Sequence, residues 1–177
     1  MKQDRSIIVG FNAFDLLKIA MFAERQRCVK RSLGVKSRKY DENKGEYELH
    51  YIGAMGEVAI SNEFDVPLDF AVHANGDNGT DIFINEWKCQ VKTFCHTAKE
   101  IDFFLNDMSQ FNAQVGVGVQ VLSPVRVRIM GCISRAKFEE KSDTRNYGYG
   151  DRLLVHEREL SAVSVLYERK PNLQEVK

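Results

Sequence analysis

The sequence lacks an excess of either charge and lacks a long hydrophobic run. Its 177 residues include 25 lysines and arginines and 25 aspartates and glutamates, so the formal net charge is zero. Net charge therefore neither indicates nor excludes a nucleic-acid partner, because binding depends on where the charges lie. The first residues hold a short apolar patch, Ile7–Val9. We expect no secretory signal, no transmembrane segment and no membrane partner.

Cysteine is present but lacks the spacing of a disulfide framework or a zinc site. The four cysteines are Cys28, Cys89, Cys95 and Cys132, and no CxxC pair occurs. Cys89 and Cys132 lie within apolar runs, where a free thiol behaves as a small hydrophobe. Cys95 beside His96 is a poor nucleophile–base pair, since adjacent strand residues point to opposite faces. The pattern favours a reducing cytoplasm.

The composition is that of a globular protein, with 44% hydrophobic and 28% charged residues. The length suits one domain over residues 1–177, which we divide into an N-terminal helical and basic extension over 1–45 and a core over 46–170. A first helix is expected over Asn12–Ser32, with Asn12 as its N-cap and Gly34 just beyond its end. Its packing face should hold the apolar residues at helical spacing, which are Phe14, Leu17, Met21 and Cys28.

The rest of the chain predicts strands and helices in mixed order. A second helix is expected over His50–Glu63, where Gly53, Ala54 and Gly56 allow close approach, and Pro67 disfavours its continuation. Expected strands are Leu68–His73, Asp81–Asn85, Trp87–Thr93 and a hairpin broken at Leu122–Val125. We also expect short helices over Thr97–Met108 and Arg135–Lys141, a loop over Ser142–Arg152, and a strand or helix over Glu157–Lys170. This order predicts an α/β domain with a mixed sheet flanked by helices.

Basic residues follow one another between Arg25 and Lys39 without an intervening acid. They are Arg25, Arg27, Lys30, Arg31, Lys36, Arg38 and Lys39. One interpretation is a solvated helix face followed by an exposed loop. The other is a patch that contacts phosphates, with Lys36, Arg38 and Lys39 as the nucleic-acid-binding residues.

Polar side chains converge around Lys92 at the end of an expected strand. Because side chains alternate on a strand, Gln90 and Lys92 share one face. A hairpin at Asn85–Glu86 brings Asp81 beside them, and Glu57 lies on a helix that must dock on the same sheet. Such a set suits metal-assisted phosphodiester hydrolysis. The local alternatives are a solvated Glu57, an Asx turn at Asp81 and a lysine that extends to solvent from a strand end.

These residues, in this order, resemble the PD-(D/E)xK nuclease superfamily, which includes Holliday junction resolvases, phage recombination nucleases and restriction endonucleases. The resemblance covers Ile52–Thr93 and rests on "GxxGE", "GTD" and "QVKT". It implies a restriction-endonuclease-like αβββαβ core with an extra N-terminal helix. It also implies that Glu57, Asp81 and Gln90 are catalytic ligands of Mg²⁺ or Mn²⁺, and that Lys92 is the catalytic lysine.

The function implied is that of a magnesium-dependent DNA endonuclease acting on branched, recombination or repair DNA. The expected partners are DNA and, as an option, a second copy of the chain in a homodimer, in a bacterial or phage-infected cell. Gln90 departs from the family pattern, where an acid is usual. The amide still offers an oxygen but removes one negative charge, which should weaken metal binding. The alternative is a non-catalytic nucleic-acid- or protein-binding module that retains the fold.

Overall fold

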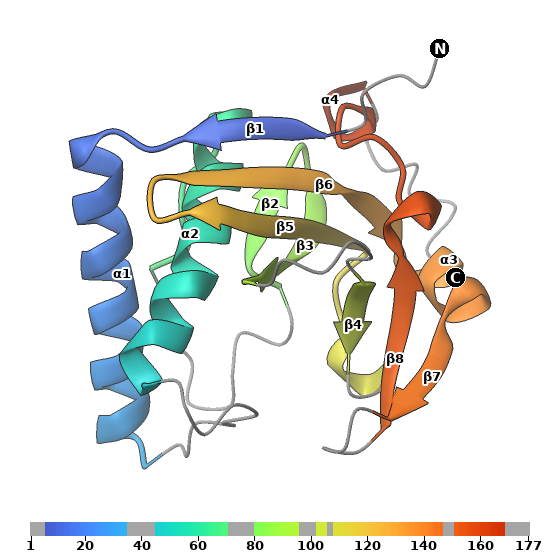
Figure 1. Ribbon diagram of the computed structural model, residues 1–177, viewed down its shortest axis with the longest axis horizontal. Helices are drawn as coiled ribbons and strands as arrows, with labels where there is room; N and C mark the ends of the chain where they lie inside the picture. Colours follow the sequence, from blue (N-terminus) through green and yellow to red (C-terminus); the bar gives the residue numbers. More distant parts are fainter. Residues whose placement is uncertain are drawn as a thin grey trace.

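The computed structural model describes residues 6–34, 45–70, 80–95, 102–105, 108–146 and 151–168. Within these ranges the chain is a mixed α/β domain with two sheets (Figure 1). The helices are α1 (Ala13–Ser32), α2 (Glu46–Phe64), α3 (Arg135–Lys141) and α4 (Val165–Glu168), with 3-10 turns at Met108–Gln110 and Glu157–Glu159. No helix of the described part is long and apolar enough to cross a membrane.

The larger sheet has five strands in the order β1-β6-β5-β3-β2. These are β1 (Ile7–Gly10), β2 (Ile82–Ile84), β3 (Trp87–Phe94), β5 (Val115–Ser123) and β6 (Arg126–Ser134). β3 and β5 run parallel, whereas the other neighbouring pairs are antiparallel. The smaller sheet, in the order β4-β8-β7, contains β4 (Asp102–Leu105), β7 (Asp143–Asn146) and β8 (Asp151–His156).

Helix α2 packs on one face of the larger sheet, and α1 lies beside α2 (Figure 1). Asn12 begins α1 with a capping box: its Oδ1 accepts hydrogen bonds from the amides of Phe14 at 2.8 Å and Asp15 at 3.0 Å. The Asp15 carboxylate accepts the Asn12 amide in return, and its other oxygen accepts from Asn62 of α2 at 2.9 Å. This buried acid therefore caps the start of one helix and ties it to the next. The predicted N-cap at Asn12 is confirmed.

The predicted packing face of α1 is wrong. Phe14, Leu17 and Met21 are 73%, 56% and 64% exposed, and Cys28 is exposed as well. The buried residues of the helix are Asp15, Ile19, Phe22 and Ala23. Both sets have helical spacing, and periodicity alone does not say which of two apolar faces meets the core. Packing against α2 determines which face is buried, since Ile19, Phe22 and Ala23 share one core cluster with residues of α2.

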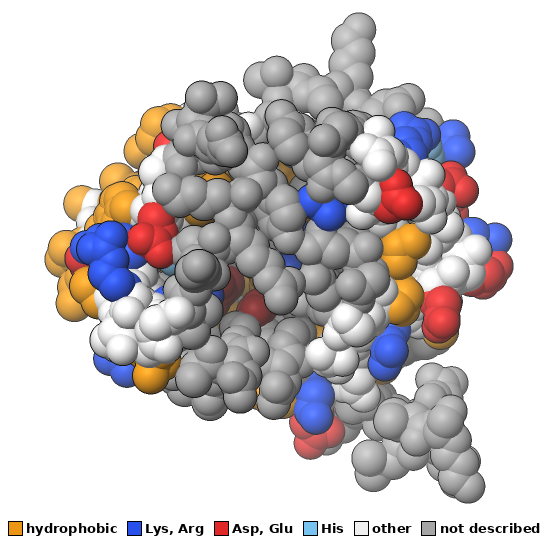
Figure 2. All heavy atoms as spheres, turned by 90° about the horizontal axis from the view of Figure 1, so that it is seen from below, with side chains coloured by type: hydrophobic (Ala, Val, Ile, Leu, Met, Phe, Trp, Pro, Cys, Tyr) orange, Lys and Arg blue, Asp and Glu red, His pale blue; other side chains and the backbone are white. Residues whose placement is uncertain are grey.

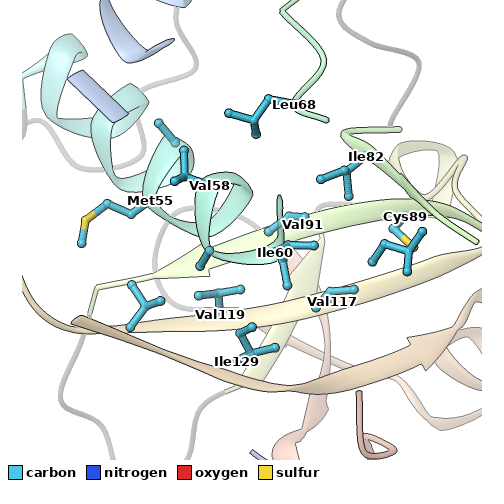
Figure 3. Packing of buried hydrophobic residues seen from close by; sticks show 14 of the residues in the cluster. Met55, Val58, Ile60, Leu68, Ile82, Cys89, Val91, Val117, Val119 and Ile129 are labelled. Atoms are coloured by element: carbon cyan, nitrogen blue, oxygen red, sulfur yellow. The ribbon is translucent and has the colours of Figure 1, made fainter. Parts of the chain in front are cut away.

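The main core lies between α2 and the five-stranded sheet (Figure 3). Val58 and Ile60 of α2 meet Val91, Val117 and Ile129, which come from three neighbouring strands. A second apolar cluster lies on the other face of the sheet and includes Phe94, Phe111, Met130 and Phe138, with Val155 from β8. The larger sheet therefore has an apolar cluster on each side, and Gln90 within it is only 5% exposed.

Several predicted elements agree with the structure and several do not. The hairpin strands around Leu122–Val125 and the helix Arg135–Lys141 are confirmed. The helix expected over Thr97–Met108 is wrong, since Asp102–Leu105 forms β4 paired with β8. The loop expected over Ser142–Arg152 contains β7, and β8 begins within it. Residues 68–70 are not a strand, and 71–73 lie outside the described residues.

Candidate active site

The candidate site is built on the β2–β3 hairpin. Asn85 and Glu86 turn the chain with φ angles of +47° and +74°, the left-handed pair of a tight two-residue hairpin turn. The turn fixes the register, in which Ile82 faces Cys89 and Ile84 faces Trp87. Continued by one residue, that register places Asp81 beside Gln90. The predicted hairpin at Asn85–Glu86 is confirmed.

Asp81 lies at the point where β2 stops. Its backbone amide donates to the carbonyl of Cys89 at 2.9 Å, and its Oδ2 accepts from the amide of Val91 at 2.6 Å. The carboxylate thus occupies the place along β3 where the next residue of a neighbouring strand would pair. This hydrogen bond holds the Asp81 carboxylate next to Gln90. It also engages one of the two carboxylate oxygens.

Gln90 and Lys92 point to the face of the sheet that is turned away from α2. Cys89 and Val91 lie in the core between α2 and the sheet (Figure 3). Because side chains alternate along a strand, those of Gln90 and Lys92 point to the opposite face. Gln90 is 5% exposed, and its Oε1 is buried without a hydrogen-bond partner among the described residues. Lys92 is half-buried.

Two glycines of β5 flank this polar pair. In the parallel register Gln90 faces Gly116 and Lys92 faces Gly118. Neither glycine contributes a side chain beyond Cα on the β5 side of the pair. Neither glycine is among the residues predicted for the site. A sequence signal for them is nevertheless present in "VGVGV", where glycines alternate with valines. Glycine inside a strand often marks a place where a ligand or another backbone approaches closely.

Glu57 lies on the helix that covers the opposite face. Its neighbour Gly56 packs so closely on β3 that an added Cβ would collide with Oγ1 of Thr93 and lie 3.1 Å from Cγ1 of Val91. Glu57 itself is half-buried. The structure thus brings Asp81, Gln90 and Lys92 to one face of the hairpin and places Glu57 on α2, across the sheet from Gln90 and Lys92.

Figure 2 shows the molecule from below; a hollow lies near the middle of the side shown, and acidic side chains are visible inside it. In the part of the chain that the structure describes, no group of three or more His, Cys, Asp or Glu residues is arranged to hold a metal ion. Described carboxylates, histidines and thiols alone therefore do not make up a metal site.

The two buried cysteines are poor candidates for a nucleophile. Burial raises the pKa of Cys89 to about 12 and that of Cys132 to about 11, so both are protonated thiols at neutral pH. Cys95 is exposed, and His96 lies outside the described residues. The buried thiols act as apolar core residues.

Part of the predicted basic patch is neutralised within the chain. Arg27 is paired with Glu24 at 2.6 Å, and Arg31 is 3.6 Å from Glu46 of α2. Arg25 donates to the carbonyl of Phe70 at 3.0 Å. Lys36, Arg38 and Lys39 lie outside the described residues. The acid-free run in the sequence is therefore not an acid-free surface on α1.

No protein-family model, curated protein or solved structure matches this chain.

Proposed function

We propose that this protein is a metal-dependent DNA nuclease with a PD-(D/E)xK-like site on the β2–β3 hairpin. The observation that carries the proposal is the buried Oε1 of Gln90, which has no hydrogen-bond partner among the described residues. Gln90 itself lies beside Asp81 in the strand register and two residues before Lys92. Leaving a buried carbonyl oxygen unsatisfied costs about 1–3 kcal/mol. A cation ligated by that oxygen would offset the cost.

The donor atoms suit a hard divalent cation such as Mg²⁺ or Mn²⁺. Asp81 would supply a carboxylate oxygen and Gln90 its amide oxygen, and water and a substrate phosphate would complete the shell. When bound, the metal would polarise the phosphate and lower the pKa of a coordinated water. Glu57 fits less well, because its helix covers the other face of β3. The expected affinity for metal is therefore low.

Lys92 has a separate role in the proposal. Lys92 is half-buried and lies two residues beyond Gln90 on the same face, where its neighbour in register on β5 is Gly118. A cation there would stabilise negative charge that builds up on a phosphate during hydrolysis, and it would hold the phosphate in place beforehand. The resemblance to junction-resolving and recombination nucleases makes branched DNA the first substrate to test.

The test is cleavage of a supercoiled plasmid and of a synthetic four-way junction in Mg²⁺, Mn²⁺ or EDTA. Cleavage should need the metal and should fall at least about 100-fold in Asp81→Asn and Lys92→Met, as is typical when a positioned charge is removed. Lys88→Met is the matched control, since Lys88 is an exposed lysine on the same strand. Equal activity in Lys92→Met and Lys88→Met would reject the assignment of Lys92.

A binding module without catalysis is the second candidate. It is favoured by two observations, the hydrogen bond that engages Oδ2 of Asp81 with Val91 and the placement of Glu57 across the sheet. In that case DNA is bound equally well in EDTA and in Mg²⁺, and no substrate is cut. Asp81→Asn separates the two: it should lower metal-dependent cleavage in a nuclease and leave DNA binding by the module unchanged.

A further inference from the structure

Helices α3 and α4 lie at the end of the larger sheet that is away from α1 (Figure 1). Residues of both helices and of the neighbouring strands line a pocket of about 480 Å³, a size typical of small-molecule sites in proteins. Among the lining residues, Val115 and Cys132 belong to the core cluster that includes α2, and Trp87 packs against that cluster. The pocket is therefore on the opposite face of the sheet from Gln90 and is separate from the candidate active site.

One side of the pocket is apolar. Trp87 and Val115 come from the paired strands β3 and β5, and Val165 and Leu166 come from α4. Asn85 of the β2–β3 turn donates from its Nδ2 to the carbonyl of Leu166 at 2.8 Å, which holds α4 beside the start of β3. An aromatic ring and three aliphatic side chains thus form a surface on which an apolar group can pack.

The other side of the pocket is polar. It is lined by Ser134 at the end of β6, Lys137 of α3, and the pair Cys132 and Ser161. The amides of Cys132 and Ser161 donate to each other's carbonyls at 2.9 and 2.8 Å, so the donors left for a ligand are side-chain groups. Burial raises the pKa of the Cys132 thiol, and the positive charge of Lys137 opposes that rise, so the ammonium acts on this part of the pocket.

Lys137 is the one charged residue among the described residues that line the pocket. Its Nζ donates to the backbone carbonyl of Glu159 at 2.6 Å, which leaves two of its three N–H groups for other acceptors. The carboxylates of the neighbouring elements have other cations: Glu159 is 3.4 Å from Arg158, and Glu140 is 2.7 Å from Lys141. The pocket therefore has a positive charge at its polar side and no described acid in its lining.

We propose that this pocket binds a small carboxylate with a compact apolar body. The carboxylate would be held by the ammonium of Lys137 with the hydroxyl of Ser161, and the body would pack against Trp87 and Leu166. One ammonium with hydroxyl donors suits a single negative charge, whereas phosphate sites commonly combine an arginine fork or several backbone amides. An apolar pocket with a few polar groups at one side is the usual form of a site for such a ligand.

Tryptophan fluorescence tests the binding directly, because Trp87 is the only tryptophan of the chain and lines the pocket. Cyclohexanecarboxylate is titrated into the full chain in EDTA and without DNA, so the result does not depend on nuclease activity. The emission should change saturably, with a dissociation constant in the micromolar to millimolar range. Cyclohexanecarboxamide, which has the same body without the charge, should bind at least about tenfold more weakly.

Two variants assign the binding to this pocket. Lys137→Met should weaken binding of the carboxylate at least about tenfold and leave binding of the amide unchanged, whereas Lys141→Met, an exposed lysine of the same helix, is the control. Val165→Glu should also weaken carboxylate binding, since it adds a negative charge to the lining. Val125→Glu is its control, because Val125 is similarly exposed but lies in the β5–β6 turn.

Three results would overturn the proposal. The first is a parent protein that shows no saturable change in fluorescence and no heat of binding with the carboxylate. The second is equal binding of the carboxylate and the amide, or tighter binding of cyclohexyl phosphate than of either. The third is carboxylate binding in Lys137→Met and Val165→Glu that equals that of the parent. Circular dichroism checks that each variant keeps the fold, which is expected for Val165→Glu because Val165 is 40% exposed.

Discussion

Gln90 is a buried neutral amide beside the charged residues Asp81 and Lys92. Two substitutions distinguish a role in metal binding from a role in stability. Gln90→Met removes a buried oxygen without a described partner at similar volume, so the free energy of unfolding should stay level or rise by up to about 1 kcal/mol without metal. Gln90→Glu adds a charge next to Asp81, so half-maximal cleavage should need less Mg²⁺.

Metal titrations of cleavage and thermal unfolding in EDTA measure both effects. An unchanged Mg²⁺ midpoint in Gln90→Glu would show that residue 90 is not a ligand. A large loss of stability in Gln90→Met would show that the amide has a structural partner instead.

His50 gives the stability a pH dependence of known sign. Its Nε2 is buried without a described partner, and burial, together with nearby Lys30, lowers its pKa below 6.5. The unfolded chain then binds a proton more readily than the folded one as pH falls below that value. The thermal midpoint of the parent should therefore drop more between pH 7.5 and 5.5 than that of His50→Leu, which keeps the other histidines. Parallel curves for the two proteins would contradict this.

Two glycines of α2 have opposite expected effects, although the sequence assigns them the same role. Gly56 packs on Thr93 and Val91, so Gly56→Ala should lower the free energy of unfolding by about 1–3 kcal/mol through overpacking. Gly53 has nothing within 4 Å of an added Cβ, so Gly53→Ala should raise it by up to about 1 kcal/mol through helix propensity. Urea unfolding of both variants measures the difference. Destabilisation of similar size in both would mean that α2 does not sit on β3 as described.

The same helix shows what the sequence can predict about an element. Alternation and turn residues predict the β2–β3 hairpin and the shared face of Gln90 and Lys92, because both depend on neighbours in the chain. The face of α2 that meets β3 depends on packing across the sheet, which is why the placement of Glu57 relative to Gln90 could not be predicted. The two apolar sides of α1 are a second case: the spacing of Phe14 and Leu17 is as helical as that of Ile19 and Phe22.

Strands that pair far along the chain are the hardest to predict. The residues of β4 on their own favour a helix and those of β7 a loop, because each segment is short and polar or ambiguous in isolation. Both are strands because β8 lies between them. Four exposed residues such as Asp143–Asn146 carry no apolar pattern, so their extended form comes from the partner and not from their own composition.

For the molecule as a whole, DNA binding should depend on the basic residues predicted to contact phosphates. Reversing the charges of Lys36, Arg38 and Lys39 should weaken binding and reduce the slope of log K against log salt by nearly one for every phosphate that the variant no longer neutralises. Arg27→Gln is the control, since Glu24 already neutralises Arg27, and it should change little. Fluorescence anisotropy with labelled duplex at several salt concentrations measures both. An unchanged slope in the triple variant would leave the solvated-face interpretation standing.

The pairing of β1 with β6 also sets the order in which the protein can fold. Ile7 pairs with Ile129, and β4 pairs with a strand that ends at His156, so β1 and β4 both wait for distant partners. The α1–α2 pair can form early from local contacts, whereas sheet closure must bring together segments separated by most of the chain. On the ribosome the N-terminal strand would emerge long before β6 exists. Until then the unpaired edge of β1, which includes Ile8, can form hydrogen bonds with the wrong strand of the same or another chain.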